Sequence, residues 1–384
     1  MKILHTADWH VGRTIRGRSR AEEHREVLAE IVDVAADRQV DLVVVAGDLF
    51  DSAAPSAESE RLVYRALLDL AEVAPVVAVA GNHDHPGRLR AVTPLLDLGR
   101  VTMAATPARP DEGGRVTVTT DSGEVARLAL LPFVSRRAIV RAQHLMEGEA
   151  AEHEGTYAAR LQSVIAHLVG DLDLDVVNLV VAHVMVHGAT LGGGERSAHT
   201  IFDYSIPASS FPGGLGYVAL GHLHRPQRIP APAPVWYSGS PLQLDFGEVA
   251  DTKAVLVVEA EPGVPARVEE VPLRGGRRLV HLAGTFEEVI EAGRRMDGVY
   301  LRVELDEPAR AGLADDVRAE LPDAVDVVLA PSRREARSRD RAPRRGRSPI
   351  ELFAEYLEER GARDERVEAL FVELLDEVHA APPP

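Results

Sequence analysis

The sequence lacks cysteine altogether and contains only two lysines, Lys2 and Lys253. Without cysteine, the chain forms neither disulfide bonds nor cysteine-ligated zinc sites, and it has no thiol nucleophile. Because lysine is scarce, arginine carries almost all of the positive charge, a bias typical of proteins from GC-rich genomes. The number of arginines alone therefore says little about function.

Long apolar runs are absent as well. The longest, such as residues 42–46 and 179–182, have the length of a strand, so we expect no segment that spans a membrane. The start of the chain turns polar by Thr6 and Asp8, too early for a signal peptide. The cytoplasm is therefore the expected location.

Positive charge is in deficit, with 43 Lys and Arg against 60 Asp and Glu and a formal net charge of −17. Such acidity argues against a protein that coats nucleic acid. It does not exclude an enzyme that reaches phosphate groups through divalent metal ions, because each ion supplies positive charge locally. The length of 384 residues predicts two or three domains.

Short β-branched runs alternate with amphipathic helical patterns over residues 1–275. This alternation predicts an α/β domain in which the loops at strand ends are available for chemistry. The expected strands are 2–6, 42–46, 76–80, 128–131, 176–182, 217–220 and 254–258, and the expected helices are 21–38, 58–72 and 88–98.

A second pattern, over residues 276–331, predicts a small βαβαβ unit. Its expected strands are 279–282, 299–305 and 325–329, and its expected helices are 286–294 and 311–321. Residues 332–347 are rich in arginine and have no apolar periodicity, so we expect a flexible basic linker. Ser348 and Glu351 then form the pattern of a capping box, which predicts a helical tail over residues 348–384.

Five short polar segments each follow or adjoin an expected strand. They are Asp8-Trp9-His10, Gly47-Asp48-Leu49-Phe50-Asp51, Gly81-Asn82-His83-Asp84, Ala182-His183 and Gly221-His222-Leu223-His224. Divalent metal ions bind such carboxylate oxygens and imidazole nitrogens. Two ions about 3.5–4 Å apart need a shared carboxylate, and an aspartate that follows a strand and a glycine suits that position. A single segment of this kind is more often a turn, but five in succession predict a two-metal site.

The order of these segments resembles that of the calcineurin-like binuclear metallophosphoesterases. Other stretches are similar to one family among them, the SbcD nuclease subunits: residues 8–14, 47–51 with Pro55-Ser56, and 237–242 with 246–248. The resemblance implies a four-layer α-β-β-α sandwich with a small α/β capping domain and a C-terminal helical tail. It also implies a nuclease that uses Mn²⁺, with Mg²⁺ as a weaker substitute. The implied activities are double-strand exonuclease and single-strand or hairpin endonuclease, in repair and recombination of DNA.

The resemblance also implies roles for polar residues of the five segments. One metal ion would be held by Asp8, His10, Asp48 and His224, and the other by Asp48, Asn82, His183 and His222, with Asp48 as the bridge. His83 would contact the phosphate or protonate the leaving oxygen, unless it only packs in its turn. Asp51 is open between orienting a ligand histidine and capping a helix.

Several other polar residues near the motifs are expected to have different roles. We expect His5 in the core, His85 in a solvated loop and His187 outside the metal site. A run of arginines after the first motif is open between binding the DNA backbone and lying in a solvated loop. These arginines are Arg13, Arg16, Arg18 and Arg20.

Two apolar surfaces are expected to bind partners. In the resembled family, the helices after the second and third motifs pair across a two-fold axis, which implies a homodimer; the alternative is that their apolar side chains pack on their own sheet. These side chains are Leu62, Leu67, Leu68, Leu70, Leu89, Val92, Leu95 and Leu96. The tail is similar to helices that bind an SbcC-like ATPase, with Phe353 and Phe371 as anchors, because a hairpin this small cannot bury two apolar stripes alone. The alternative is that it folds back on the core.

Two other functions are open at this stage. A small-molecule phosphodiesterase or phosphatase would use the same metal site, since fold alone does not determine the substrate. Such an enzyme has little need for the unit and tail after residue 275. A non-catalytic scaffold is the other alternative, and the complete set of ligand residues argues against it.

Overall fold

The structure, a computed structural model, describes residues 1–147, 156–170, 172–173, 175–193, 195 and 205–330, and in the tail 353–354, 356–358, 364 and 366–372. The chain divides into two compact units, Met1–Val328 and Leu329–Pro384. Within the described residues, no helix is both long and apolar enough to cross a membrane.

Two six-stranded sheets form the centre of the first unit. The first sheet has the order β16-β15-β1-β4-β5-β6, with β1 (Lys2–Thr6), β4 (Leu42–Val45), β5 (Val76–Val79), β6 (Val101–Ala104), β15 (Ala254–Glu261) and β16 (Val264–Pro272). The second has the order β13-β14-β12-β9-β8-β7, with β7 (Arg115–Thr119), β8 (Val125–Leu131), β9 (Val177–His183), β12 (Tyr217–Gly221), β13 (Gln227–Ile229) and β14 (Val235–Tyr237). Strands β1, β4, β5 and β6 are parallel, as are β8, β9, β12 and β14.

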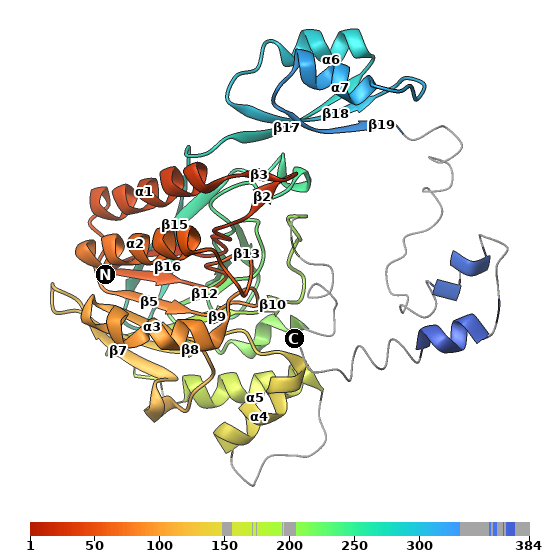
Figure 1. Cartoon of the computed structure of the whole chain (residues 1–384). Coiled ribbons are helices and arrows are strands. Elements are labelled where there is room, and N and C mark those ends of the chain that lie inside the picture. The colour runs from red at the N-terminus through yellow and green to blue at the C-terminus, as the bar shows by residue number, and fades with distance from the viewer. Residues whose placement is uncertain are drawn as a thin grey trace. The chain divides into compact units, whose positions relative to one another are not determined.

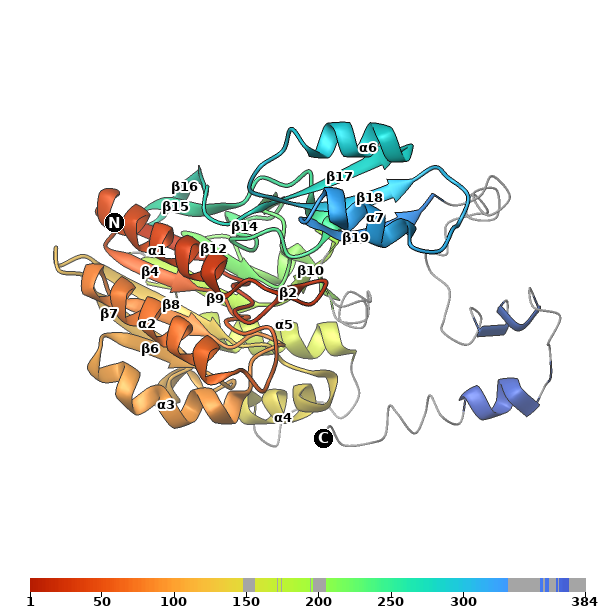
Figure 2. The ribbon, with the colours of Figure 1, turned by 45° about the horizontal axis from the view of Figure 1, so that its top comes forward.

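Five helices cover the outer faces of the two sheets. They are α1 (Ala21–Asp37), α2 (Ala57–Val73), α3 (Pro86–Leu98), α4 (Arg136–Glu147) and α5 (Tyr157–Val169). Figure 2 shows α1, α2 and α3 along the first sheet, and Figure 1 shows α4 and α5 on the far side of the second. The observed bounds of α1, α2 and α3 lie within two residues of those expected from the sequence.

Three apolar cores separate these layers, because successive side chains of a strand point to opposite faces. In β1, Leu4 joins the core under the helices of the first sheet, whereas Ile3 joins the core between the sheets. In β9, Val180 packs on the side of α4 and α5, and Val181 packs between the sheets. The expected four-layer α-β-β-α sandwich is confirmed.

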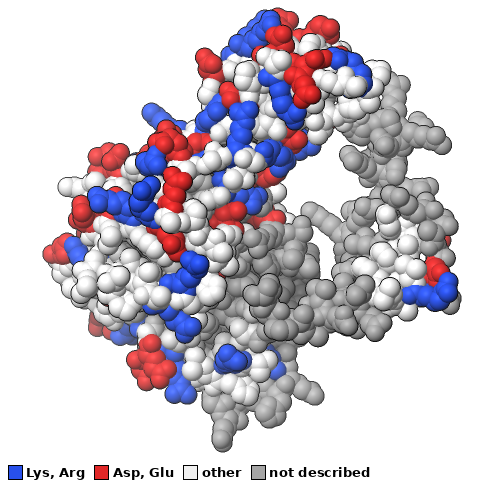
Figure 3. All heavy atoms as spheres, viewed as in Figure 1, with Lys and Arg blue, Asp and Glu red and all other residues white. Residues whose placement is uncertain are grey.

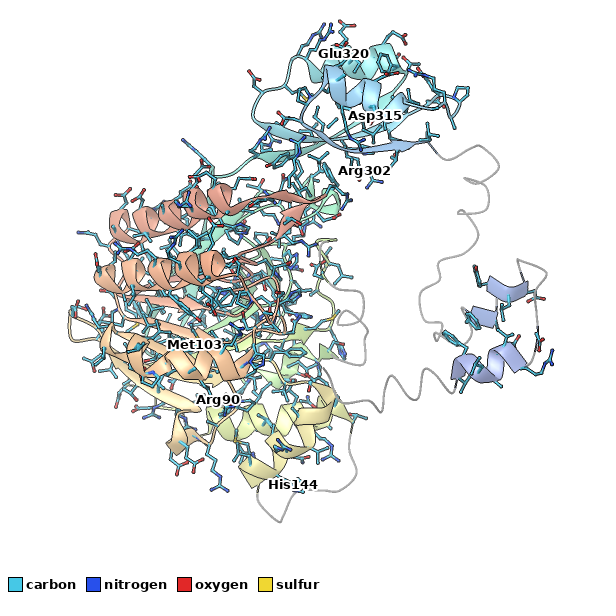
Figure 4. All side chains as sticks on the ribbon, viewed as in Figure 1. Arg90, Met103, His144, Arg302, Asp315 and Glu320 are labelled. Carbon is cyan, nitrogen blue, oxygen red and sulfur yellow. The ribbon has the colours of Figure 1, made fainter. Side chains whose placement is uncertain are left out.

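A smaller α/β unit follows the sandwich in the sequence. Its strands β17 (Arg278–Gly284), β18 (Val299–Leu305) and β19 (Ala324–Leu329) form a sheet in that order, and α6 (Phe286–Gly293) and α7 (Leu313–Glu320) pack on it. In Figure 4, Arg302 lies on the sheet side of this unit and Glu320 in its helical layer. The βαβαβ order agrees with the expectation. The domain boundary at residues 275 and 276 stays a prediction and falls between β16 and β17.

A separate apolar cluster joins this small unit to the sandwich. It combines Ile15 of the hairpin β2 (Thr14–Ile15) and β3 (Arg18–Ser19) with residues of a loop and of the small unit. These are Phe246, Leu279, Tyr300 and Val325. The small unit therefore shares buried surface with the sandwich, which explains why both fall within one compact unit.

The second compact unit contains the tail. Residues 353–354, 356–358 and 366–372 are helical, and the rings of Phe353 and Phe371 stack with their centroids 3.9 Å apart. The two residues expected to anchor a partner thus pack on each other. Exposed apolar side chains are nevertheless present at Tyr356, Val367 and Leu370. The expected linker at 332–347 and Ile350, Leu352, Leu374, Leu375 and Val378 lie outside the described residues.

Candidate metal centre

The five polar segments meet where parallel strands of both sheets end. Asp8 and His10 follow β1, Asp48 follows β4, Asn82 and His83 follow β5, His183 ends β9, and His222 and His224 follow β12. Parallel strands of one sheet end at the same edge, so segments far apart in sequence come together there. All of these side chains are buried except that of Asn82, which is half-buried.

Four residues of the centre adopt a left-handed backbone, which residues other than glycine rarely do. The φ angles are 53° at Asp8, 46° at His10, 52° at Asp48 and 109° at His222. Such conformations cost on the order of 1–3 kcal/mol each and concentrate at functional sites. Hydrogen bonds between the loops hold them: the Asp8 N–H donates to the carbonyl of Gly47 at 2.9 Å, and the His10 N–H donates to that of Asp48 at 3.0 Å.

Two glycines allow the loops to approach each other this closely. A Cβ atom on Gly81 would lie 2.1 Å from Oδ1 of Asp48, and one on Gly47 would lie 2.4 Å from Nδ1 of His183. Gly47 also has a φ of +92°, which favours glycine on its own account. Both positions therefore require glycine if the polar side chains are to stay where they are.

Asp48 lies at the centre of the cluster. Its Oδ1 accepts the backbone N–H of His83 at 2.7 Å, and its Oδ2 lies 3.5 Å from Nε2 of both His10 and His183. Burial alone would raise the pKa of Asp48, but His183 and His10 hold it well below its usual range. Two groups of potential metal ligands, His10-Asp48-His83 and Asp8-Asp48-His183, share this residue, with ligand atoms within 4.8 Å of one another in each group. A bridging ligand needs this shared position.

A second set of ligand atoms converges beside Asp48. Oδ1 of Asn82 lies 2.9 Å from Nε2 of His183 and 2.8 Å from Nδ1 of His222, and these two nitrogens are 3.3 Å apart. Burial favours a lower pKa for His183, yet the carboxylates of Asp48 and Asp8 outweigh it and raise the pKa to about 9. This part of the centre therefore favours a positive charge.

His10 tests whether the centre suits a metal ion. Both of its ring nitrogens are buried without a hydrogen-bond partner among the described residues. Nε2 lies 3.5 Å from Asp48 and Nδ1 lies 3.6 Å from Asp51. Burial lowers the pKa of His10 to about 4, so the neutral ring has a lone pair available. An unpaired buried polar group costs about 1–3 kcal/mol, and binding a metal ion would offset that cost.

The side chain of His83 is fixed by a hydrogen bond in addition to packing. Its Nδ1 lies 2.7 Å from the backbone carbonyl oxygen of Asp51, to which it donates a hydrogen bond, and its ring meets the ring of His10 edge-on at 4.5 Å. The side chain of Asp51 contacts His10 and, at 3.2 Å, Arg13. Helix α2 is instead capped by Ser56. Of the two roles open for Asp51, helix capping is therefore wrong.

The three histidines that were expected outside the metal site have other surroundings. His5 is buried, with Nδ1 2.9 Å from the hydroxyl of Tyr217, so its expected place in the core is confirmed. His85 is exposed in the loop before α3, as expected, and it also caps that helix by accepting the backbone N–H of Arg88. His187 is exposed and follows β10 (Met185–Val186), which pairs with β11 (Ser205–Ile206).

The arginines after the first motif were expected either to bind the DNA backbone or to lie in a solvated loop, and three of them instead form ion pairs within the chain. Arg16 pairs with Asp326 at 3.0 Å, and Arg18 pairs with Asp323 at 3.5 Å, so both bind the small unit. Arg20 is buried and pairs with Glu23 at 2.7 Å. Long arginine side chains near the metal motif therefore serve the packing of this region, which the sequence pattern does not reveal.

Comparison with known proteins agrees with this geometry. A family model of calcineurin-like phosphoesterases matches residues 1–226. The chain is 37% identical over 285 residues to the SbcD subunit of nuclease SbcCD from Bacillus subtilis (strain 168), covering 73% of this chain and 71% of that protein. The same-named protein of Rhodobacter capsulatus is 33% identical over 337 residues, covering 80% and 81%. That of Escherichia coli K12 is 29% identical over 295 residues, covering 75% and 72%.

The chain belongs to the SbcD family. It is accordingly a metal-dependent phosphodiesterase of a nuclease family, and the small-molecule phosphatase alternative is not favoured. The phosphoesterase fold implies a two-metal centre, and the acidic and imidazole groups found together here suit one.

Three further buried residues of this SbcD-family chain support the centre, and the sequence patterns assign no role to any of them. Asp84 accepts the backbone N–H of Gly81 at 2.8 Å. Burial, with the negative charge of Asp48, raises the pKa of Asp84 to about 6. Glu248 contacts His224, and Lys253 contacts Glu248. Asp84 belongs to the third polar segment, and Glu248 belongs to residues 246–248, which resemble the family. The sequence does not reveal their roles, because their contacts form only in the folded chain.

Proposed function

We propose that the chain is the nuclease subunit of an SbcCD-like complex that cleaves DNA ends and hairpins with two Mn²⁺ ions, Mg²⁺ being a weaker substitute. The observation that carries this proposal is the pair of ligand groups that share Asp48. The relatives that are SbcD subunits of nuclease SbcCD support the substrate and the assembly.

In this proposal each metal ion has four protein ligands. One ion is held by Asp8, His10, Asp48 and His224, and the other by Asp48, Asn82, His183 and His222. When bound, the two ions supply a hydroxide nucleophile at neutral pH and stabilise charge on the phosphoryl oxygens. The buried carboxylates of Asp8 and Asp48, which also raise the pKa of His183, favour the positive charge that this arrangement needs.

His83 is the proposed general acid. Its Nδ1–H donates to the carbonyl of Asp51, and Nε2 is the nitrogen that we expect to carry a proton to the leaving oxygen. The ring contacts His10 and lies beside Asn82 in the chain, so it is close to the proposed ligands of both ions. A positioned acid at this place lowers the cost of expelling the 3′- or 5′-oxygen of the cleaved strand.

The surface charge is consistent with phosphate binding through the metal ions. On the face shown in Figure 3, acidic and basic side chains are intermixed over the described part of the chain. The net charge of −17 would repel DNA at long range. The proposal therefore assigns phosphate recognition to the metal centre and not to a broad basic surface.

Replacement of the shared ligand tests the proposal. Asp48→Ala should lose both Mn²⁺ ions together and all cleavage of duplex and hairpin DNA, whereas Asp121→Ala, at an exposed turn, should keep both. The measurements are metal content by elemental analysis and DNA cleavage with and without the ATPase partner. Two tightly bound ions and intact cleavage in Asp48→Ala would contradict the proposal. Hydrolysis of a simple phosphodiester but not of DNA would favour the small-molecule alternative.

A further inference from the structure

We infer that Glu248 is a positioning residue that fixes the ring of His224 for metal binding, an inference that rests on the proposed function. Glu248 is fully buried, and its Oε1 lies 2.9 Å from Nδ1 of His224. A carboxylate accepts hydrogen bonds only, so it selects the tautomer of His224 with the proton on Nδ1. The lone pair then lies on Nε2, the nitrogen on the other side of the ring.

The direction of this hydrogen bond matters because His224 borders the centre. The rings of His224 and His10 meet with their centroids 4.9 Å apart. A histidine with the opposite tautomer would present an N–H to the metal and could not bind it. Histidine ligands of metals commonly donate their other N–H to a carboxylate, which fixes the orientation of the ring and raises its basicity.

Glu248 is itself held on its second oxygen. Its Oε2 accepts from Nζ of Lys253 at 2.7 Å and from the backbone N–H of Leu244 at 3.0 Å. The residue ends the single helical turn η5 (Phe246–Glu248). Both carboxylate oxygens therefore have partners, and the group cannot turn away from His224 without leaving buried donors unpaired.

Lys253 completes the support on the other side of His224. Its ammonium group lies 2.7 Å from Glu248, 3.0 Å from Oγ of Ser240 and 2.9 Å from the carbonyl oxygen of His224. An ammonium has three protons, and three acceptors surround it. Arginine would bring a planar fork that does not match such a compact arrangement. One of the two lysines in this arginine-rich chain thus holds the backbone of His224 while Glu248 holds its ring.

A purely structural ion pair makes a different prediction from a positioning role. Loss of a structural pair would lower the thermal stability and weaken both metal sites alike. Loss of a positioning group would weaken only the ion that His224 binds, because Asp48, Asn82, His183 and His222 have no contact with Glu248 among the described hydrogen bonds. The two roles are therefore distinguished by how many of the two metal sites lose affinity in the variant.

The experiment is a Mn²⁺ titration of the full chain, stripped of metal, by calorimetry. Wild type should bind two ions, and Glu248→Gln should bind one with unchanged affinity and one about 10–100-fold more weakly. Glutamine keeps the size of the side chain but places an amide N–H₂ against Lys253 or His224. Cleavage by the variant should need more Mn²⁺ and should recover at saturating Mn²⁺.

Glu23→Gln is the matched control. Glu23 is also buried and paired with a base, Arg20, at 2.7 Å, but its described contacts include none of the proposed ligands. It should lower the melting temperature and leave both Mn²⁺ affinities unchanged. If Glu248→Gln does not fold, the double variant Glu248→Gln, Lys253→Met removes the unpaired ammonium and should show the same selective loss.

Equal weakening of both ions, or two unchanged affinities in a folded Glu248 variant, would overturn the inference while the two-metal proposal stands. If wild type itself binds no Mn²⁺, the proposed metal centre fails, and the role of Glu248 fails with it. Selective weakening that saturating Mn²⁺ reverses would support both.

Discussion

Two histidines of the metal centre are oriented by hydrogen bonds at Nδ1. Nδ1 of His183 lies 2.8 Å from the carbonyl oxygen of Ala46, and Nδ1 of His224 lies 2.9 Å from Glu248. His10 is the exception, since neither of its ring nitrogens has a hydrogen-bond partner in the described chain. Its ring lies 3.5 Å from Asp48 and 3.6 Å from Asp51 without a hydrogen bond to either, and we attribute this to its use as a ligand.

At this scale we expect His83→Ala to separate chemistry from metal binding. The variant should retain two Mn²⁺ ions and lose about 10²–10⁴-fold in turnover, the usual contribution of a general acid. His85→Ala is the control, because His85 caps α3 and lies outside the cluster of ligands. It should lose stability of about 1 kcal/mol and little turnover. Joint loss of metal and turnover in His83→Ala would make His83 a structural residue.

A second prediction at this scale concerns acid stability. Burial lowers the pKa of His5 to about 3, from an ordinary value of 6.5 in the unfolded chain. Between these values the unfolded chain binds a proton that the folded chain does not, so stability is complete above pH 6.5 and falls with pH below it. The loss is about 1.4 kcal/mol per pH unit.

His5→Gln should therefore flatten the decline of the free energy of unfolding between pH 6 and 4, as measured by urea denaturation in EDTA. His24, whose pKa burial lowers to about 4, acts in the same direction and remains in both proteins. An unchanged slope in the variant would show that His5 does not titrate on unfolding.

The sequence identified the proposed ligands but not the groups that orient them. Motif residues such as Asp48 follow glycines at strand ends, a pattern that can be recognised in the sequence. Glu248 lies 24 positions after His224, at the end of the short turn η5, and Lys253 precedes β15, so no spacing links them to the centre. Their roles depend on tertiary contacts that local patterns do not encode.

Secondary-structure elements were predicted best where they are buried on both faces. Strands β4 and β5 read as continuous apolar runs because a sheet or helices cover each side. The short strands β13 and β14 and the helices α4 and α5 were not predicted. β13 has three residues, and α4 begins with two arginines, so neither gives a long apolar period.

At the scale of the elements, we predict a homodimer that forms through helices α2 and α3. Leu67, Leu70, Leu89 and Leu96 are buried against the chain's own sheet, so only part of the expected surface is available. Leu68, Leu95 and Leu98 are exposed, the last by 85%. Leu68 of α2 lies close to the end of α3, since a Cβ atom on Gly99 would be 2.6 Å from it. The exposed leucines of the two helices are therefore near each other.

We expect light scattering at micromolar concentration to give the mass of a dimer. The double variant Leu95→Glu, Leu98→Glu should be monomeric and still folded, because both side chains are exposed on the single chain. Val264→Glu, at another exposed apolar residue, on β16, should remain dimeric. A monomer mass for wild type would contradict the prediction.

At the scale of the whole molecule, the chain combines a catalytic sandwich, a small α/β unit and a helical tail. Stacking of Phe353 on Phe371 occupies the two phenylalanines of the described tail. Tyr356, Val367 and Leu370 remain exposed and are the better candidates for a partner surface. A helical hairpin of this size buries too little apolar area to account for them alone.

Deletion of residues 348–384 should leave metal-dependent cleavage of simple DNA intact and abolish co-purification with an SbcC-like ATPase, together with any stimulation by ATP. In the full chain, Leu370→Asp should weaken the same association, because Leu370 is half exposed and the aromatic stack does not need it. Arg366→Ala, on an exposed residue of the same helix, serves as the control. Undiminished binding of the ATPase by the truncated chain would refute this role of the tail.

The hairpin of β2 and β3 connects the first metal motif to the small α/β unit. Its base is the loop that carries Asp8 and His10, and its tip places Ile15 in the apolar cluster with Leu279 and Tyr300. Arg16 and Arg18 fasten the tip to acidic residues of the small unit. A force applied to the small unit is therefore transmitted along a few residues of backbone to the first proposed metal ligands.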